Sequence, residues 1–197
     1  MLAAIILAGG ESRRMGTPKA LLPFRGISFL QHLVNATRHA RIGPRRVVLG
    51  AGAEQIRAQL GVGPEMIVLN PDWEKGQLAS IQAGIRSLSE ETEGIVLCPV
   101  DHPLVSANLI SNLIHQFDSS GKLIVLPAFR GQRGHPVIFR NTLYSELLAA
   151  PFDIGARQVV WAHPHDVEEV PTEEEGVILN LNDPEALKKA MSSGSTK

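Results

Sequence analysis

The chain has 197 residues, of which 44% are hydrophobic, and its formal net charge is -1. A chain of this length can bury one substantial core, so we expect a single domain over residues 1–191 and a disordered tail over 192–197. The near-neutral charge argues against nucleic-acid binding by broad electrostatic attraction. The single cysteine, Cys98, excludes an intrachain disulfide framework and a zinc site built from several thiolates, and its apolar neighbours predict a buried thiol.

Short apolar runs alternate with helical patterns through the first 120 residues. The runs over 2–8, 47–50, 66–69 and 95–99 are predicted as buried strands. Helices are predicted over 28–36, with Ser28 as its cap, and over 54–60, 78–88 and 107–117. This alternation is typical of a parallel sheet with helices on both faces, in which ligands bind at the carboxyl ends of the strands.

The second half of the chain has a different pattern. Two runs with strand character, 122–127 and 135–139, flank the turn-rich segment 129–134, which predicts an antiparallel hairpin added to the sheet. Short helices over 144–149 and 155–162, strands over 166–170 and 177–181, a solvated acidic turn over 173–175 and a last helix from 183 complete the prediction. The fold class is therefore α/β, with a mostly parallel sheet and an antiparallel hairpin insertion. The first apolar run is too short to span a membrane, so we expect a cytoplasmic protein with no membrane partner.

A glycine-rich, basic segment follows the first predicted strand directly. Gly9 and Gly10 lack a Cβ, so the backbone can approach a ligand closely and turn its N–H groups toward phosphate oxygens. Arg14 and Lys19 supply a forked guanidinium and a mobile ammonium for an anion. The segment is either a polyphosphate-binding loop or a solvated basic turn. It matches neither G-x-x-x-x-G-K-[ST] nor G-x-G-x-x-G.

Asp101 follows another predicted buried strand, at the edge of the sheet where the glycine-rich segment also begins. A carboxylate in this place can hold Mg²⁺ between itself and phosphate oxygens. The alternative is that Asp101 only caps the following turn.

Several segments resemble the MobA-like nucleotidyltransferases. Residues 7–19, LAGGESRRMGTPK, match the signature L-A-G-G-x-S-x-R-M-G-x-x-K of that family. Further matches are D-x-P at 101–103, N-P-x-x-x-x-G-x-x-x-S at 70–80, G-x-x-G-H-P at 131–136, D-I-G-A-R at 153–157 and N-x-N-D-P-E at 180–185. The resemblance covers residues 7–185 and implies a Rossmann-like three-layer α/β/α nucleotidyltransferase fold.

The resemblance also implies an activity and the residues that carry it. The reaction would be Mg²⁺-dependent transfer of a nucleoside monophosphate from a nucleoside triphosphate to a phosphorylated acceptor, with Arg14, Lys19 and Asp101 as catalytic residues. The implied nucleotide-binding residues are Leu7, Ala8, Gly9, Gly10, Lys19, Gly76 and Ser80, and the implied acceptor-binding residues are Arg133, His135, Gly155 and Arg157. Asp101 and Asn182 are the implied metal ligands, although a neutral amide is a weaker ligand than the aspartate of relatives.

The closest resemblance is to the molybdenum cofactor cytidylyltransferases, because of the segments at 70–80, 131–136 and 153–157. It implies CTP and molybdopterin as substrates and a molybdoenzyme or its chaperone as protein partner. The first alternative is the guanylyltransferase that joins GTP to the same pterin, since cytidylyltransferases often have alanine in place of Gly9 or Gly10. A sugar- or methylerythritol-phosphate nucleotidyltransferase and a catalytically silent nucleotide-binding module are the remaining alternatives.

Overall fold

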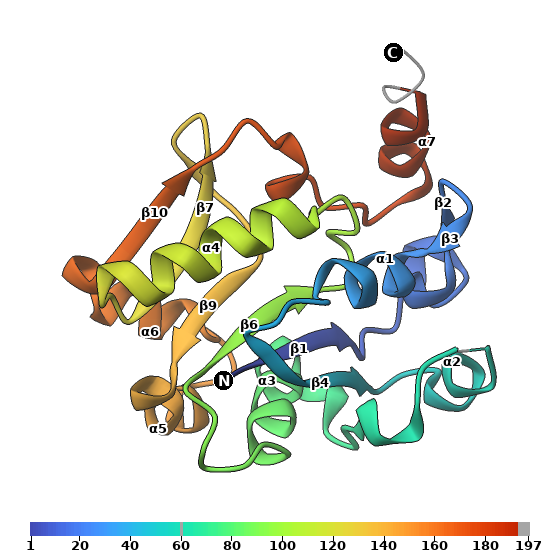
Figure 1. The fold of residues 1–197 in the computed structure, drawn as a ribbon. Helices are drawn as coiled ribbons and strands as arrows, with labels where there is room; N and C mark the ends of the chain where they lie inside the picture. Colours follow the sequence, from blue (N-terminus) through green and yellow to red (C-terminus); the bar gives the residue numbers. More distant parts are fainter. Residues whose placement is uncertain (60, 193–197) are drawn as a thin grey trace.

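A computed structural model describes residues 1–59 and 61–192. A central sheet is covered by helices on both of its faces, which gives three layers (Figure 1). Leu60, a residue of the second predicted helix, and residues 193–197 of the predicted tail lie outside the described residues.

The strands of the sheet lie in the order β10-β7-β9-β6-β1-β4-β5. Their bounds are β1 Leu2–Ala8, β4 Ile42–Leu49, β5 Ile67–Leu69, β6 Gly94–Pro99, β7 Ile124–Phe129, β9 Val137–Arg140 and β10 Val167–Pro171. β9 runs antiparallel to β6 and β7, whereas the other neighbours in this order are parallel. The α/β prediction is confirmed, and the antiparallel hairpin lies within the sheet and not at its edge. Two short hairpins accompany it: β8 (Gln132–Arg133) pairs with β7, and β2 (Pro23–Phe24) pairs with β3 (Ile27–Ser28).

The helices form two layers. Their bounds are α1 Phe29–Ala36, α2 Ala53–Gln59, α3 Gln77–Arg86, α4 Ala107–Ser120, α5 Tyr144–Ala149, α6 Arg157–Ala162 and α7 Pro184–Ser192. Along β1, Ala4 and Ile6 pack in one hydrophobic cluster with α1 and α4, whereas Ala3 and Ile5 pack in another with α3, α5 and α6. Successive residues of a strand point to opposite faces, so a strand that is covered on both sides is apolar throughout.

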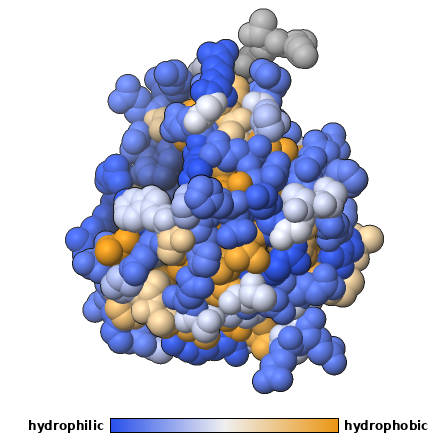
Figure 2. Space-filling model, turned by 90° about the vertical axis from the view of Figure 1, so that its left-hand side faces the viewer, coloured by the Kyte–Doolittle hydropathy of each residue, from blue (hydrophilic) through white to orange (hydrophobic). Residues whose placement is uncertain are grey.

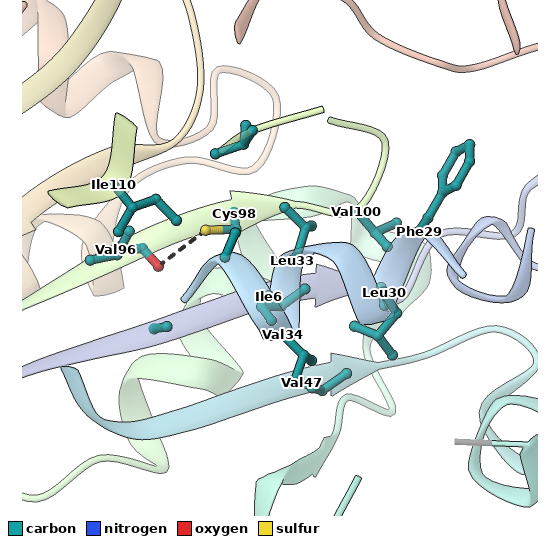
Figure 3. Close-up of a cluster of buried hydrophobic side chains, with 14 of the residues drawn as sticks. Ile6, Phe29, Leu30, Leu33, Val34, Val47, Val96, Cys98, Val100 and Ile110 are labelled. Carbon is teal, nitrogen blue, oxygen red and sulfur yellow. Dashed lines mark hydrogen bonds between the residues drawn. The ribbon is translucent and has the colours of Figure 1, made fainter. Parts of the chain in front are cut away.

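Buried apolar side chains of the first cluster pack between α1 and the carboxyl half of the central strands (Figure 3). In this view Cys98 lies near Leu33 of α1, and Val47 lies beside Val34 of the same helix. The Cys98 Sγ donates a weak hydrogen bond to the carbonyl oxygen of Val96 at 3.9 Å, and burial raises the pKa of the thiol to about 12. The prediction of a buried cysteine is confirmed.

Serine side chains begin the two helices of this layer. The Ser28 Oγ accepts a hydrogen bond from the Gln31 N–H at 3.2 Å, as predicted, and the Ser106 Oγ accepts one from the Leu109 N–H at 3.0 Å. Ser106 also donates to the Glu174 carboxylate at 2.6 Å, so one residue of the predicted solvated acidic turn is bound to α4.

The prediction of a strand over 177–181 is wrong. Val177 ends a 3-10 turn, and the residues after it are irregular although Val177 and Leu181 are buried. The segment makes single backbone contacts instead of a ladder: the His135 N–H donates to the Val177 carbonyl, and the Leu181 N–H donates to the Asp101 carbonyl, each at 2.9 Å. It therefore crosses the loops that follow the strands, which explains its apolar pattern and carries Asn182 toward Asp101.

The surface on the side of β10 and α6 is largely hydrophilic, with hydrophobic residues interspersed (Figure 2). The large apolar side chains that are exposed include Phe152 and Ile154, from the loop between α5 and α6, and Trp161 of α6. In the described ranges, no helix combines the length and apolar character that crossing a membrane would take.

Candidate active site

Three chain segments leave the sheet together at the carboxyl end of β1. Leu7 is paired with Val48 of β4 on one side and with Pro99 of β6 on the other. The Ala51 N–H donates to the Gly9 carbonyl at 3.1 Å, and the Val100 N–H donates to the Leu7 carbonyl at 3.0 Å. The loops that follow β1, β4 and β6 therefore start side by side.

A cavity of about 630 Å³ lies at this edge of the sheet. Its lining contains all the residues for which nucleotide binding was predicted, namely Leu7, Ala8, Gly9, Gly10, Lys19, Gly76 and Ser80. Asp101 lines the same cavity. The position of a ligand site at the carboxyl ends of parallel strands is the one that the fold class favours.

The loop that follows β1, residues 9–19, is called the glycine loop here. It is closely packed around Gly9 and open around Gly10. A Cβ on Gly9 would lie 3.1 Å from the Ser80 Oγ and 3.3 Å from the Gly50 nitrogen, whereas a Cβ on Gly10 would meet no atom within 4 Å. Ser12 has a left-handed backbone (φ 55°), and its Oγ accepts a hydrogen bond from the Lys19 N–H at 3.0 Å. The loop thereby folds back on itself and brings the side chain of Lys19 into the cavity.

Lys19, Asp101 and Asn182 converge. The Lys19 Nζ lies 3.3 Å from the Asp101 Oδ2 and also donates a hydrogen bond to the Asn182 Oδ1. The side chains of Lys19 and Asp101 are only 18% and 19% exposed, so solvent screens this ion pair less than one on the open surface.

The two oxygens around the Lys19 ammonium fit a divalent cation. The ammonium is itself a cation held by a carboxylate and an amide oxygen, which are ligand types that Mg²⁺ accepts. Among residues 1–59 and 61–192, no three His, Cys, Asp or Glu side chains are arranged to bind a metal ion. Mg²⁺ commonly takes one or two protein ligands and completes its shell with water and substrate phosphates, so these residues suit an ion that binds together with a phosphorylated ligand.

Gly50, Asn70 and Trp73 also shape the site. Asn70 begins the motif at 70–80 but had no predicted role of its own, and Gly50 and Trp73 were not singled out. The buried Asn70 side chain donates to the Ser80 Oγ at 3.0 Å and accepts from the Asp72 N–H at 3.0 Å. A Cβ on Gly50 would lie 2.4 Å from the Trp73 Cβ, so only glycine allows this approach. The signal that could have found Gly50 is its place directly after the apolar residues of a predicted strand, at the edge of the sheet where a ligand is expected.

The structure does not place Arg14 in the cavity. Arg14 is exposed, and the neighbouring Arg13 contributes to the lining while its guanidinium donates to the Glu11 carboxylate at 2.6 Å. The catalytic role of Arg14 stays a prediction.

The residues predicted to bind the acceptor lie outside the cavity lining. Arg133 is exposed and forms an ion pair with Glu169 at 2.7 Å, and Arg157 is exposed at the start of α6. Gly155 precedes it with a left-handed backbone (φ 77°). Their acceptor-binding roles, like that of His135, stay predictions.

The half-buried His135 packs against the buried His102. The two ring centroids lie 4.9 Å apart, and within the described part of the chain the Nδ1 atoms of both rings are buried without a hydrogen-bond partner. Burial, and secondarily the neighbouring His102, lowers the pKa of His135 to about 4, and burial lowers the pKa of His102 as well. Both rings are therefore neutral at pH 7.

The chain is similar to known proteins over most of its length. The MobA-like NTP transferase domain family matches residues 4–167. The molybdenum cofactor guanylyltransferase of Cereibacter sphaeroides is 33% identical over 195 residues, which cover 97% of this chain and 96% of that protein. The nicotine blue oxidoreductase of Paenarthrobacter nicotinovorans is 28% identical over 181 residues, 88% of each chain.

Solved structures show the same fold. The crystal structure of Rv0371c from Mycobacterium tuberculosis superimposes with a TM-score of 0.86 and 26% identity over 98% of both chains. A complex of that protein with manganese has a TM-score of 0.82 and 24% identity, again over 98% of both chains. The predicted three-layer fold is confirmed. The chain belongs to the MobA-like NTP transferase family and is a nucleotidyltransferase.

Proposed function

We propose that the protein is a GTP:molybdopterin guanylyltransferase, which transfers GMP from GTP to the phosphate of molybdopterin. The observation that carries the proposal is the convergence of Lys19 and Asp101 at 3.3 Å in a cavity lined by the glycine loop. The preference for GTP rests on the similarity to a guanylyltransferase over nearly the whole chain and on the presence of both Gly9 and Gly10. These findings favour this alternative over the cytidylyltransferase that the motifs first suggested.

In the proposed reaction an oxygen of the acceptor phosphate attacks the α-phosphorus of GTP. A bond forms between that oxygen and the α-phosphorus, the bond to the bridging oxygen of the β-phosphate breaks, and pyrophosphate leaves. Gly9 and Gly10 would let the backbone approach the phosphates, and Lys19 would neutralise the charge that develops on them. No general base is needed, because the acceptor phosphate is already an anion.

The proposed cofactor is Mg²⁺, held by Asp101 and Asn182. When bound, it would supply additional positive charge to the triphosphate. The Lys19 ammonium now occupies the position between these two oxygens. We propose that Lys19 leaves them for the phosphates when the nucleotide and the metal bind.

Cytidylyl transfer to the same pterin is the second candidate. It is favoured by the segments at 70–80, 131–136 and 153–157, which include Arg133, His135, Gly155 and Arg157 as proposed acceptor-binding residues. A molybdoenzyme or its chaperone is the protein partner that both candidates share.

Pyrophosphate release measured with molybdopterin and each of the four ribonucleoside triphosphates, with and without Mg²⁺, tests the proposal. Release that requires Mg²⁺ and is fastest with GTP is the expected result. A preference for CTP would replace the guanylyl proposal with the cytidylyl one. Absence of release with every triphosphate would favour the silent nucleotide-binding module.

A further inference from the structure

Glu74 lines the cavity, and the proposed reaction gives its carboxylate no role. In the described lining, acidic side chains come from Glu11, Glu74 and Asp101. Asp101 is paired with Lys19 at 3.3 Å, and Glu11 accepts from Arg13 at 2.6 Å. Across residues 1–59 and 61–192, Glu74 forms no comparable ion pair.

Glu74 is exposed at the rim of the cavity, and a carboxylate without a cationic partner is unfavourable beside a triphosphate because like charges repel. Lys19 and Asp101 mark the end of the cavity where we place the phosphates. Glu74 comes from a different segment, the 3-10 turn Trp73–Lys75, which follows β5 and precedes α3. It therefore suits a part of the ligand that is neutral and rich in hydrogen-bond donors.

The turn that carries Glu74 is held in place by its neighbours. The Gly76 N–H donates to the Trp73 carbonyl at 3.1 Å, and the Lys75 N–H donates to the Asp72 carbonyl at 3.0 Å. Trp73 packs against Gly50 and contributes to the same lining as Glu74. The cavity thus has a flat aromatic group and a carboxylate on adjacent residues.

A carboxylate discriminates among the nucleobases. Guanine presents two adjacent donors, the N1–H and the N2 amino group, which match the two oxygens of one carboxylate. Adenine and cytosine each present an amino group next to a ring nitrogen that is an acceptor, so the second carboxylate oxygen would face a lone pair. The chemistry favours guanine.

We propose that Glu74 is a specificity-determining residue that selects guanine by accepting hydrogen bonds from its N1–H and N2 amino groups, with Trp73 as the apolar surface beside the base. This inference rests on the proposed nucleotidyl transfer and names the base that the cavity accepts.

Binding is tested by tryptophan fluorescence. The chain has two tryptophans, so the Trp161→Phe variant leaves Trp73 as the only reporter. This protein is titrated with GTP, ITP, 2′-deoxyGTP and CTP in the presence of Mg²⁺. ITP lacks only the N2 amino group, and we expect it to bind about tenfold more weakly than GTP.

Glu74→Gln in the same background keeps the shape of the side chain but has one acceptor oxygen. We expect the ratio between ITP and GTP dissociation constants to fall to about twofold or less. Glu90→Gln, which changes an exposed residue outside the cavity lining, is the matched control and should keep the full ratio.

The outcomes separate the two proposals. Equal binding of GTP and ITP, or a ratio that Glu74→Gln leaves unchanged, overturns the role of Glu74 while nucleotide binding stands. A penalty for 2′-deoxyGTP that disappears in Glu74→Gln assigns the residue to the ribose and also overturns it. If no triphosphate changes the fluorescence of Trp73, the proposed function fails together with the inference.

Discussion

The ammonium of Lys19 lies 3.3 Å from the carboxylate of Asp101, although 82 positions separate the two residues in the chain. Lys19 is held by the loop that follows β1, and Asp101 follows β6, the parallel neighbour of β1. The contact is thus a consequence of two adjacent strands ending at the same edge of the sheet. It joins the proposed phosphate site to the proposed metal site.

Removal of the Lys19 charge should expose the metal ligands. In Lys19→Met the Asp101 carboxylate has no ammonium to compensate it, so we expect the protein without nucleotide to bind Mn²⁺ more tightly than the wild type does. Pyrophosphate release should fall by at least about tenfold, because the charge on the phosphates loses a partner. Electron paramagnetic resonance titration of free Mn²⁺ measures the first effect.

Lys75→Met is the control for this experiment, since Lys75 pairs with Asp72 at 2.8 Å outside the Asp101 site. Its Mn²⁺ affinity should equal that of the wild type. Identical Mn²⁺ binding by wild-type and Lys19→Met proteins would contradict the idea that Lys19 occupies a cation position.

The two glycines of the loop should respond differently to alanine. Gly9→Ala brings a methyl group to 3.1 Å from the Ser80 Oγ and 3.3 Å from the Gly50 nitrogen, and we expect a loss of stability of about 1 kcal/mol. Gly10→Ala has open space around it and should unfold at the wild-type temperature. Thermal unfolding followed by circular dichroism compares the two variants. Equal transition temperatures would show that the loop adapts freely around residue 9.

The hydrogen bonds that Asn70 makes with Ser80 and Asp72 should stabilise the folded protein. Asn70→Ala leaves the Ser80 hydroxyl and the Asp72 N–H without their partner, and we expect a destabilisation of about 1–3 kcal/mol in urea unfolding. The control is Asn35→Ala, which removes an exposed contact with Gln31 on α1. A loss in Asn70→Ala no larger than in the control would mean that the network contributes little.

Acid should weaken the edge of the sheet opposite the cavity. Hydrogen bonds from Arg41 and from the N-terminal amine lower the pKa of Glu93 from 4.5 to about 2. Because the folded pKa is the lower one, the contribution of Glu93 is present above about pH 4.5 and is lost as the pH falls toward 2. Glu93→Gln should therefore lower the melting temperature at about pH 6.5 and make a smaller difference at about pH 3. The effect is modest, since the side chain is 46% exposed. A difference between the two proteins that does not change with pH would exclude this linkage.

Helices and strands were predicted correctly where the apolar pattern of the sequence coincides with packing in the core. β1 and α5 have the predicted bounds, because the apolar residues of each pack where their period indicates. β4 begins at Ile42, five residues before the predicted start at 47, since its polar residues still pair with β1 through Ala4 and Arg45. Within 177–181, Val177 and Leu181 are buried without strand pairing, and an apolar pattern alone does not distinguish a strand from an irregular segment with buried side chains.

The site was predictable where a motif marks it. Lys19, Asp101 and Asn182 belong to recognisable segments and lie together. Gly50 and Trp73 were missed, because their importance depends on the ends of β4 and β5 lying side by side, which no single segment records.

The transfer of labelled GMP from α-labelled GTP to molybdopterin, by the wild type and by Asp101→Asn, tests the central claim most directly. We expect the wild type to form the labelled dinucleotide in the presence of Mg²⁺ and Asp101→Asn to form it at least about a hundredfold more slowly, with a wild-type melting temperature. Equal rates for the two proteins would contradict the placement of the reaction in this cavity.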